Sequence, residues 1–126
     1  MFGIKRTSIE AVAERADSLL MIKLYRNHTR EARIQCVIES DSTILIGDII
    51  HDSQRKYNKG YGSAMMIKLI EYAKENGYSR LYGNLSVVDL NHKDRLYHFY
   101  RKFGFEITEY PEINDCYFGM IEKILQ

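Results

Sequence analysis

The sequence has 126 residues, of which 45% are hydrophobic and 28% charged, and its formal net charge at pH 7 is +1. These values predict one soluble globular domain, residues 1–126, and give no reason to expect nucleic acid or an anionic membrane as a partner. No run approaches a membrane span and the N-terminus lacks an apolar signal region, so a cytoplasmic protein is expected. The two cysteines have no metal-type spacing, so no metal site is predicted.

The first half of the chain predicts a helix followed by strands. Residues 8–16 fit a short helix capped by Thr7 or Ser8. Residues 19–25 fit either a continued helix or a strand, and the break at residues 17–18 favours a strand. Alternating apolar and polar residues over 32–39 predict a half-buried strand. A polar turn at residues 40–42 joins it in a hairpin to an apolar strand over 43–50.

The chain is organised around the stretch Asn58-Lys59-Gly60-Tyr61-Gly62-Ser63. It lies between that apolar strand and a helix from about residue 62, which ends at residues 76–77, where glycine can take a left-handed conformation. Backbone N–H groups in the first turn of a helix lack internal partners, and the helix dipole adds positive charge there. Glycine lets a ligand approach the backbone closely. The stretch therefore predicts a site for the pyrophosphate of a cofactor.

The second half alternates strands and helices. A strand over residues 81–88 after the helix implies a parallel crossover, and residues 89–92 are expected to form a loop. Leu96, Phe99, Tyr100 and Phe103 form the apolar stripe of a second helix that Gly104 ends. Strand-like residues 105–110 and 116–125 predict a closing hairpin. The fold class is α/β: one mixed sheet with antiparallel strands, a parallel β-α-β crossover, a second helix and a closing hairpin.

Two separated stretches resemble one family. Residues 49–70, with the Gly60-Tyr61-Gly62 turn, resemble the acyl-CoA signature of the GCN5-related N-acetyltransferases (GNAT), and residues 95–105 resemble the second signature of that family. Residues 117–123 are similar to its last core strand. The resemblance covers roughly the last two-thirds of the chain. It implies an N-acetyltransferase that moves an acetyl group from acetyl-CoA, as co-substrate, to a primary amine by direct attack in a ternary complex.

The family's functional residues can be transferred to matching positions. Main chain at the end of the strand before the glycine turn would hydrogen-bond the pantetheine arm, the glycine turn would bind the pyrophosphate, and Tyr100 would be the general acid. The family's asparagine falls on Lys93 when counted back from Tyr100, or on Asn91 through a loop shift, so either would contact the cofactor. The cofactor-binding positions implied are Ile50, His51, Asp52, Asn58, Lys59, Gly60, Tyr61, Gly62, Ser63, Asn91 and Lys93.

The sequence also departs from the family pattern. Tyr57 stands where the family usually has Arg or Gln, so the phosphate contact is weakened or passes to Arg55, Lys56 or Lys59. Asn58 stands where glycine is frequent. The chain before residue 43 is short for a family whose first helices wall the acceptor pocket. A homodimer is one way to complete such a wall.

The catalytic candidates each have a packing alternative. Tyr100 would protonate the departing thiolate, but it shares an apolar helical stripe and would also fit the core. Asp48 alternates with Ile46 and Ile50 and is therefore expected on the buried side of its strand, where burial would raise its pKa and suit a general base. The alternative is a frayed strand end where Asp48 pairs with a lysine. His51 or a water relay are the other candidates for the base.

Two function classes follow. The first is an acyl-CoA-dependent N-acetyltransferase with a small-molecule or peptide amine as acceptor. The second is a non-catalytic acyl-CoA-binding or regulatory module of the same fold, which the short N-terminal region and the missing arginine favour. A nucleotide-binding P-loop is excluded, because the Gly60-Tyr61-Gly62-Ser63 turn has neither the glycine spacing nor the lysine that this loop requires.

Overall fold

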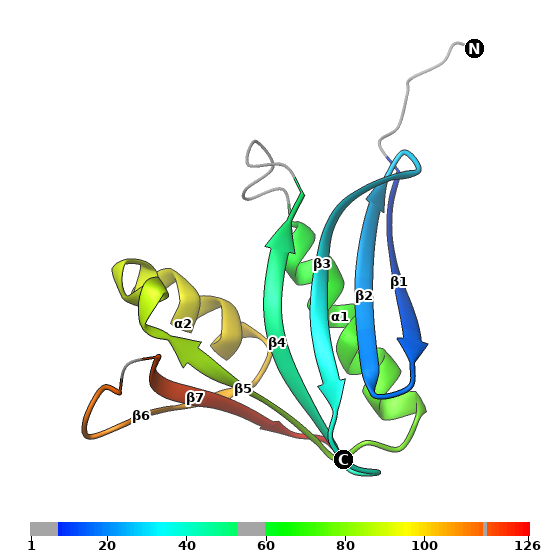
Figure 1. Cartoon of the computed structure of the whole chain (residues 1–126). Helices are drawn as coiled ribbons and strands as arrows, with labels where there is room; N and C mark the ends of the chain where they lie inside the picture. The colour runs from blue at the N-terminus through cyan, green and yellow to red at the C-terminus, as the bar shows by residue number, and fades with distance from the viewer. Residues whose placement is uncertain (1–7, 53–59, 115) are drawn as a thin grey trace.

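The computed structural model describes residues 8–52, 60–114 and 116–126. These residues form a seven-stranded sheet in the order β1-β2-β3-β4-β5-β7-β6, in which β4 and β5 are parallel and the other neighbours antiparallel (Figure 1). The predicted mixed α/β sheet is thus confirmed. The strands are β1 (Ile9–Ala16), β2 (Leu19–Arg26), β3 (Thr29–Ile38), β4 (Thr43–His51), β5 (Arg80–Ser86), β6 (Glu106–Glu109) and β7 (Tyr117–Ile124). The helices are α1 (Tyr61–Glu75), the 3-10 helix η2 (Val87–His92) and α2 (Lys93–Lys102).

The predicted N-terminal helix over residues 8–16 is wrong, because this segment is the edge strand β1. Its alanines and glutamates favour a helix only weakly, and pairing with β2 along its whole length outweighs that preference. Ala11 and Ala13 lie opposite the buried Leu24 and Ile22, so a period of two places the small residues over the core. The strand preferred for residues 19–25 is confirmed as β2. Asp17, with φ of 54°, opens the two-residue turn between the strands.

One face of the sheet carries the core. Helix α1 packs on this face of β1, β2 and β3, and Tyr97 of α2 hydrogen-bonds Glu109 of β6 on the same face. In the part of the chain that the structure describes, no helix lies between β1 and β2, and both α-helices lie on the core face. None of these helices is long and apolar enough to cross a membrane. Fully buried members of the core include Leu20, Ile22, Leu24, Ile34, Cys36, Ile44, Met65, Met66, Leu69 and Leu81.

Strand β4 contains a β-bulge at Gly47 and Asp48. Ile46 pairs with Cys36 and Ile49 pairs with Ile34, so two residues of β4 lie opposite Gln35 alone. A Cβ on Gly47 would lie 2.7 Å from the carbonyl oxygen of Gln35, so the close approach requires glycine. Across the bulge the alternation shifts by one residue, so Ile49 lies on the core face. The shift also overturns the expectation that Asp48 faces the buried side with Ile46, because Asp48 is exposed.

The glycines that were expected to end the helices do so. Gly77 follows α1 and Gly104 follows α2, with φ of 80° and 84°. The strand predicted over residues 81–88 ends earlier, at Ser86, and the predicted loop over 89–92 belongs to η2. The Ser86 hydroxyl accepts a hydrogen bond from the N–H of Val88 and so caps η2.

Candidate active site

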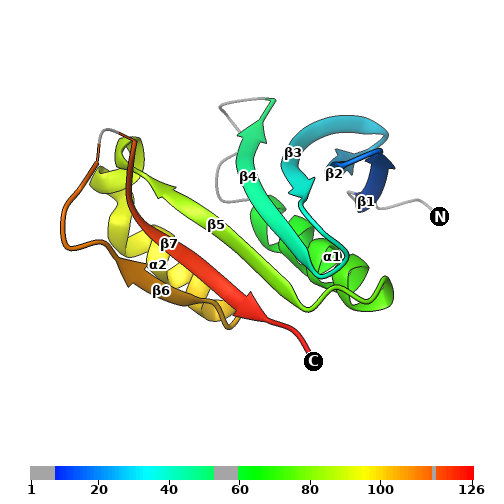
Figure 2. The ribbon, with the colours of Figure 1, turned by 60° about the horizontal axis from the view of Figure 1, so that its bottom comes forward.

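Strands β4 and β5 run together at one end and separate at the other. They pair from Thr43–Arg80 to Ile46–Gly83, and no further pair joins them along the described parts of either strand. Both views show the two ribbons diverging beyond this point (Figures 1 and 2). The divergence begins at the bulge. The peptide N–H of Asp52 donates to the carbonyl oxygen of Glu31 on β3, so by alternation the peptide groups of Ile49 and His51 point to the side of β5.

The N-terminus of α1 has the features of an anion site. Its first turn carries no acidic residue, and the N-cap is Gly60, in the left-handed region with φ of 79° and ψ of 9°. Gly60 provides no side-chain cap, and a Cβ on it would meet nothing within 4 Å. Helices usually begin with a side-chain cap and an acidic first turn, which offset the positive end of the dipole. Among the residues that the structure describes, neither is present at the start of α1, which suits the binding of an anion there.

The two family-like stretches meet at this helix end. A Cβ on Gly62 would lie 3.3 Å from the ring of Phe99, so the first turn of α1 packs closely against α2. The Nζ of Lys102 lies 2.8 Å from the Oγ of Ser63. Tyr61 is 1% exposed and its hydroxyl lies 3.3 Å from Nη1 of Arg26, so this predicted cofactor residue has its side chain in the core. Its main-chain N–H is still part of the first turn.

Tyr100 lies in the core next to these contacts. Its ring is 7% exposed and packs edge-on against Phe99 and Phe105, with centroids 5.3 and 5.5 Å away. Burial raises its pKa to about 12, and Asp89 and Cys36 add to the effect. The packing interpretation is therefore confirmed, because Tyr100 is a core residue whose phenol keeps its proton at neutral pH, and its role as the general acid stays a prediction.

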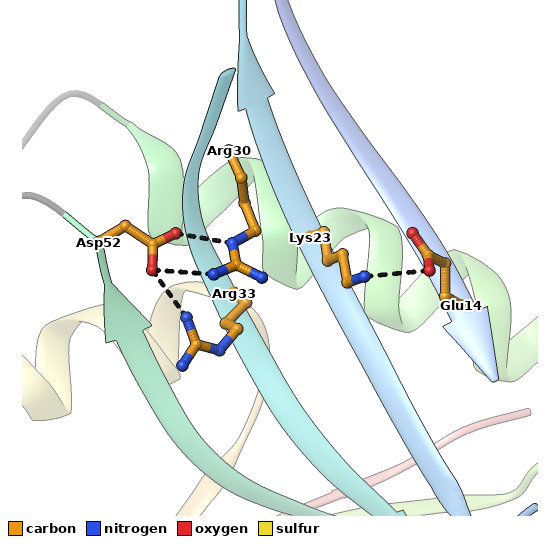
Figure 3. Close-up of polar contacts among 5 residues, drawn as sticks. All are labelled: Glu14, Lys23, Arg30, Arg33 and Asp52. Atoms are coloured by element: carbon orange, nitrogen blue, oxygen red, sulfur yellow. Dashed lines mark hydrogen bonds and ion pairs between the residues drawn. The ribbon is translucent and has the colours of Figure 1, made fainter. Parts of the chain in front are cut away.

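The other predicted residues in and after β4 differ in exposure and in their partners. Asp48 is exposed, and His51 is half-buried. The carboxylate of Asp52 binds two arginines of β3, with Arg30 Nε at 2.9 Å and Arg33 Nη1 at 2.7 Å (Figure 3). Main-chain groups at the end of this strand were expected to bind the cofactor. The N–H of Asp52 instead donates to the carbonyl oxygen of Glu31.

Asn91 and Lys93 occupy different environments. Asn91 is exposed in η2, whereas Lys93 opens α2 and its Nζ lies 2.6 Å from the carboxylate of Glu109. The Lys93 hydrogen bond, followed by that from Tyr97, lowers the pKa of Glu109. Lys93 therefore already has a carboxylate partner on β6.

Some of the predicted site residues lie in a segment that the structure does not describe. Asn58 and Lys59, together with Tyr57 and the basic residues 55 and 56, lie outside the described residues. Among residues 8–52, 60–114 and 116–126, no three His, Cys, Asp or Glu side chains are placed to hold a metal ion. A hollow of about 350 Å³ between β1 and α1 is lined by none of the predicted site residues. It is therefore separate from the candidate site.

Sequence reasoning missed the bulge and the position of Lys102. A glycine inside the apolar strand at position 47 was the available signal for the bulge, since glycine within a strand often marks one. Apart from its place in a basic cluster, nothing in the sequence indicated that Lys102 lies near the glycine turn, because its contact with Ser63 joins residues 39 apart in sequence.

Known proteins match this chain in two ways, over the segment that carries both signatures and in the fold. Residues 49–105 match the model of the acetyltransferase (GNAT) family. Over 67 residues the chain is 37% identical to the uncharacterized protein YocC of Bacillus subtilis (strain 168), a match that covers 53% of this chain but only 38% of that protein. Two solved structures, at 19% identity, superpose with a TM-score of 0.68.

These two structures share the fold over most of this chain. A GNAT family acetyltransferase from Elizabethkingia anophelis with acetyl-CoA bound matches over 90% of this chain and 95% of its own. Ard1 from Thermoplasma volcanium matches over 87% and 72%. The PaiA N-acetyltransferase from Thermoplasma acidophilum in complex with coenzyme A is 16% identical, with a TM-score of 0.67 over 86% and 62%. The matched segment contains both signatures, and the fold is common to all three structures, so this chain is similar to the GNAT family of acetyltransferases over residues 49–105 and has the same fold.

Proposed function

We propose that this chain is an N-acetyltransferase that moves the acetyl group of acetyl-CoA to a primary amine by direct attack within a ternary complex. The observation that carries the proposal is the separation of β4 from β5 after Ile46 and Gly83. It leaves the main chain of His51 directed to the side on which a pantetheine arm would lie. The uncapped N-terminus of α1 stands at the same end of β4, where the pyrophosphate would bind.

The chemistry requires few protein groups. The amine nitrogen attacks the thioester carbonyl carbon, the C–N bond forms, the C–S bond breaks, and the amine loses a proton. A main-chain N–H of β4 donates a hydrogen bond to the carbonyl oxygen as negative charge develops there. Tyr100, which its pKa of about 12 keeps protonated at neutral pH, donates its phenolic proton to the departing sulfur and regains a proton from solvent.

The base that accepts the amine proton is one of three candidates. His51 carries an imidazole that can accept a proton, and it lies on the strand edge that we assign to the cofactor. Asp48 is exposed, so it would act from the solvent side of the bulge. A water relay would need neither side chain.

We place the protein in the cytoplasm. A homodimer would supply a wall for the acceptor pocket if the pocket needs one.

Binding of acetyl-CoA is tested first by thermal unfolding. A ligand that binds only the native state raises the melting temperature, so acetyl-CoA should raise it by several degrees at a concentration of about 100 times its Kd. No shift at millimolar acetyl-CoA would contradict the proposal.

Turnover is then compared between the parent and Tyr100→Phe with a panel of primary amines. Loss of the acid should lower kcat about 100-fold and leave the Kd of acetyl-CoA nearly unchanged. Tyr72→Phe, which removes a hydroxyl from α1 at a residue stacked on Tyr78, serves as a control. Equal kcat values for Tyr100→Phe and the parent would refute the acid assignment.

A second function is favoured by one observation. A turn of only two residues joins β1 to β2, so no helices stand between these strands to wall an acceptor pocket. This arrangement suits a non-catalytic acyl-CoA-binding or regulatory module. Both functions predict the thermal shift, but only the enzyme consumes acetyl-CoA in the presence of an amine.

A further inference from the structure

We infer that Lys102 supplies the positively charged contact to the phosphates of the cofactor. The inference rests on the proposed function, since it assigns a further binding residue to the same site. It also answers a question raised by the sequence, because Tyr57 stands where the family usually has Arg or Gln. The compensating cation would come from α2.

The position of Lys102 carries the first step. Its Nζ lies 2.8 Å from the Oγ of Ser63, in the first turn of α1, although the two residues are 39 apart in sequence. The contact is supported by close packing, since Phe99 of α2 lies against Gly62. The ammonium group is therefore held beside the N–H groups that would bind the pyrophosphate.

The charge of Lys102 is not neutralised by a carboxylate among the described residues. Lys23, Lys68 and Lys93 pair with Glu14, Glu71 and Glu109 respectively. The hydrogen-bond partner of Lys102 is instead a neutral hydroxyl.

Two aromatic rings hold this ammonium group in place without cancelling its charge. Nζ lies 5.6 Å from the centroid of the Phe99 ring and 5.1 Å from that of Phe103. A cation next to the positive end of a helix is electrostatically unfavourable. An anion bound between the two would interact favourably with both.

The neighbouring basic side chains are directed elsewhere. The guanidinium of Arg101 lies 5.2 Å from the centroid of the Tyr97 ring, and Lys93 binds Glu109. Arg26 reaches the hydroxyl of Tyr61, which is buried beneath the first turn of α1. The fourth basic residue of α2, Arg95, contacts His92, so Lys102 is the one whose described contacts reach α1.

Isothermal titration calorimetry with three ligands tests the inference, namely CoA, 3′-dephospho-CoA and S-acetylpantetheine, which has neither the pyrophosphate nor the 3′-phosphate. Lys102→Gln should raise the Kd of CoA about 10-fold and leave that of S-acetylpantetheine unchanged, because one charged hydrogen bond to phosphate is lost. Lys102→Arg should retain most of the affinity. The dependence of the Kd on salt concentration should also become shallower in Lys102→Gln.

The control is Arg101→Gln, which removes the same charge from the adjacent residue of the same helix and should leave the Kd of CoA within about twofold. A rise for both CoA and 3′-dephospho-CoA in Lys102→Gln assigns the contact to the pyrophosphate, and a rise for CoA alone assigns it to the 3′-phosphate. An unchanged Kd for CoA, or an equal rise for S-acetylpantetheine, would overturn the inference. A parent protein that binds none of the three would instead refute the proposed function.

Discussion

The starts of α1 and of the η2–α2 segment differ in how their backbone N–H groups are satisfied. The start of η2 is complete within the chain, because the Ser86 hydroxyl caps it and Asp89 lies in its first turn. Helix α2 follows with Asp94 in its first turn. Helix α1 begins at a left-handed glycine with no acidic residue and no side-chain cap, and Lys102 lies beside it. Acidic residues thus offset the dipole at the starts of η2 and α2, although α2, like α1, has no side-chain cap; the first turn of α1 carries no acidic residue, which suits an anion.

The largest effect is expected from Gly62→Val, which removes the open approach to α1. The branched side chain would displace the Phe99 ring, 3.3 Å from the Cβ position, and cover the N–H groups of the first turn. The Kd of CoA should rise about 100-fold, as expected for loss of two hydrogen bonds to a charged group. Calorimetric titration measures the change. Lys74→Val, in the last turn of the same helix, is the control, and an unchanged Kd in Gly62→Val would place the pyrophosphate elsewhere.

Alkaline pH should lower the free energy of unfolding, because Tyr100 of α2 is stable in the fold only while its phenol is protonated. The unfolded phenol ionises near pH ~10, whereas burial raises the folded pKa to about 12, so the stabilisation is complete below pH ~10 and is lost as pH rises from 10 to 12. The loss amounts to about 2 to 3 kcal/mol. Urea unfolding at pH 9, 10 and 11 follows it. Tyr100→Phe should show a shallower decline, although Cys36 and Tyr97, with pKa values also raised to about 12, maintain part of it.

Ser86→Ala tests whether the chain's own side chains satisfy the backbone N–H groups at the start of η2. Loss of the hydroxyl leaves the Val88 N–H without its cap and should lower the free energy of unfolding by about 1 kcal/mol. Denaturant unfolding gives this value, and the Kd of CoA should stay the same. A large loss of CoA affinity would show that the two segments are not independent.

The smallest effect is expected from Lys93→Gln. Its ammonium binds the exposed Glu109, so removing it should change both stability and the Kd of CoA only slightly, within about twofold for the latter. Asn91→Ala is the matched test of the alternative cofactor contact. A rise in Kd for Lys93→Gln as large as that for Lys102→Gln would mean that α2 uses its start as well as its end.

The sequence allowed prediction of the elements whose limits depend on local chemistry. Glycines at positions 77 and 104 marked the ends of both helices because only they adopt the left-handed conformation cheaply. Alternation identified β3, and the apolar run identified β4. The segment now seen as β1 was misassigned because alanine and glutamate favour a helix locally, while its strand conformation depends on pairing with β2.

The candidate site was predictable in its parts but not in its assembly. The glycine turn and Tyr100 were recognisable from their sequence neighbours. The exposure of Asp48 depends on a one-residue difference between two strands, and the proximity of Lys102 to Ser63 on how two helices pack. Such tertiary contacts leave little periodic signal in the sequence.

The bulge in β4 also divides the strand into two parts that differ in the strands with which they pair. Up to Ile46 the strand is in phase with both β3 and β5, so each side chain there is constrained by two neighbours. From Ile49 onward it keeps phase with β3 only, shifted by one residue. Deleting Gly47 would leave Asp48 alone opposite Gln35 and restore simple alternation, with Ile49 still paired to Ile34 on the core face. The extra residue is therefore not what places Ile49 against Ile34; its consequence is the bend in the strand where β4 leaves β5.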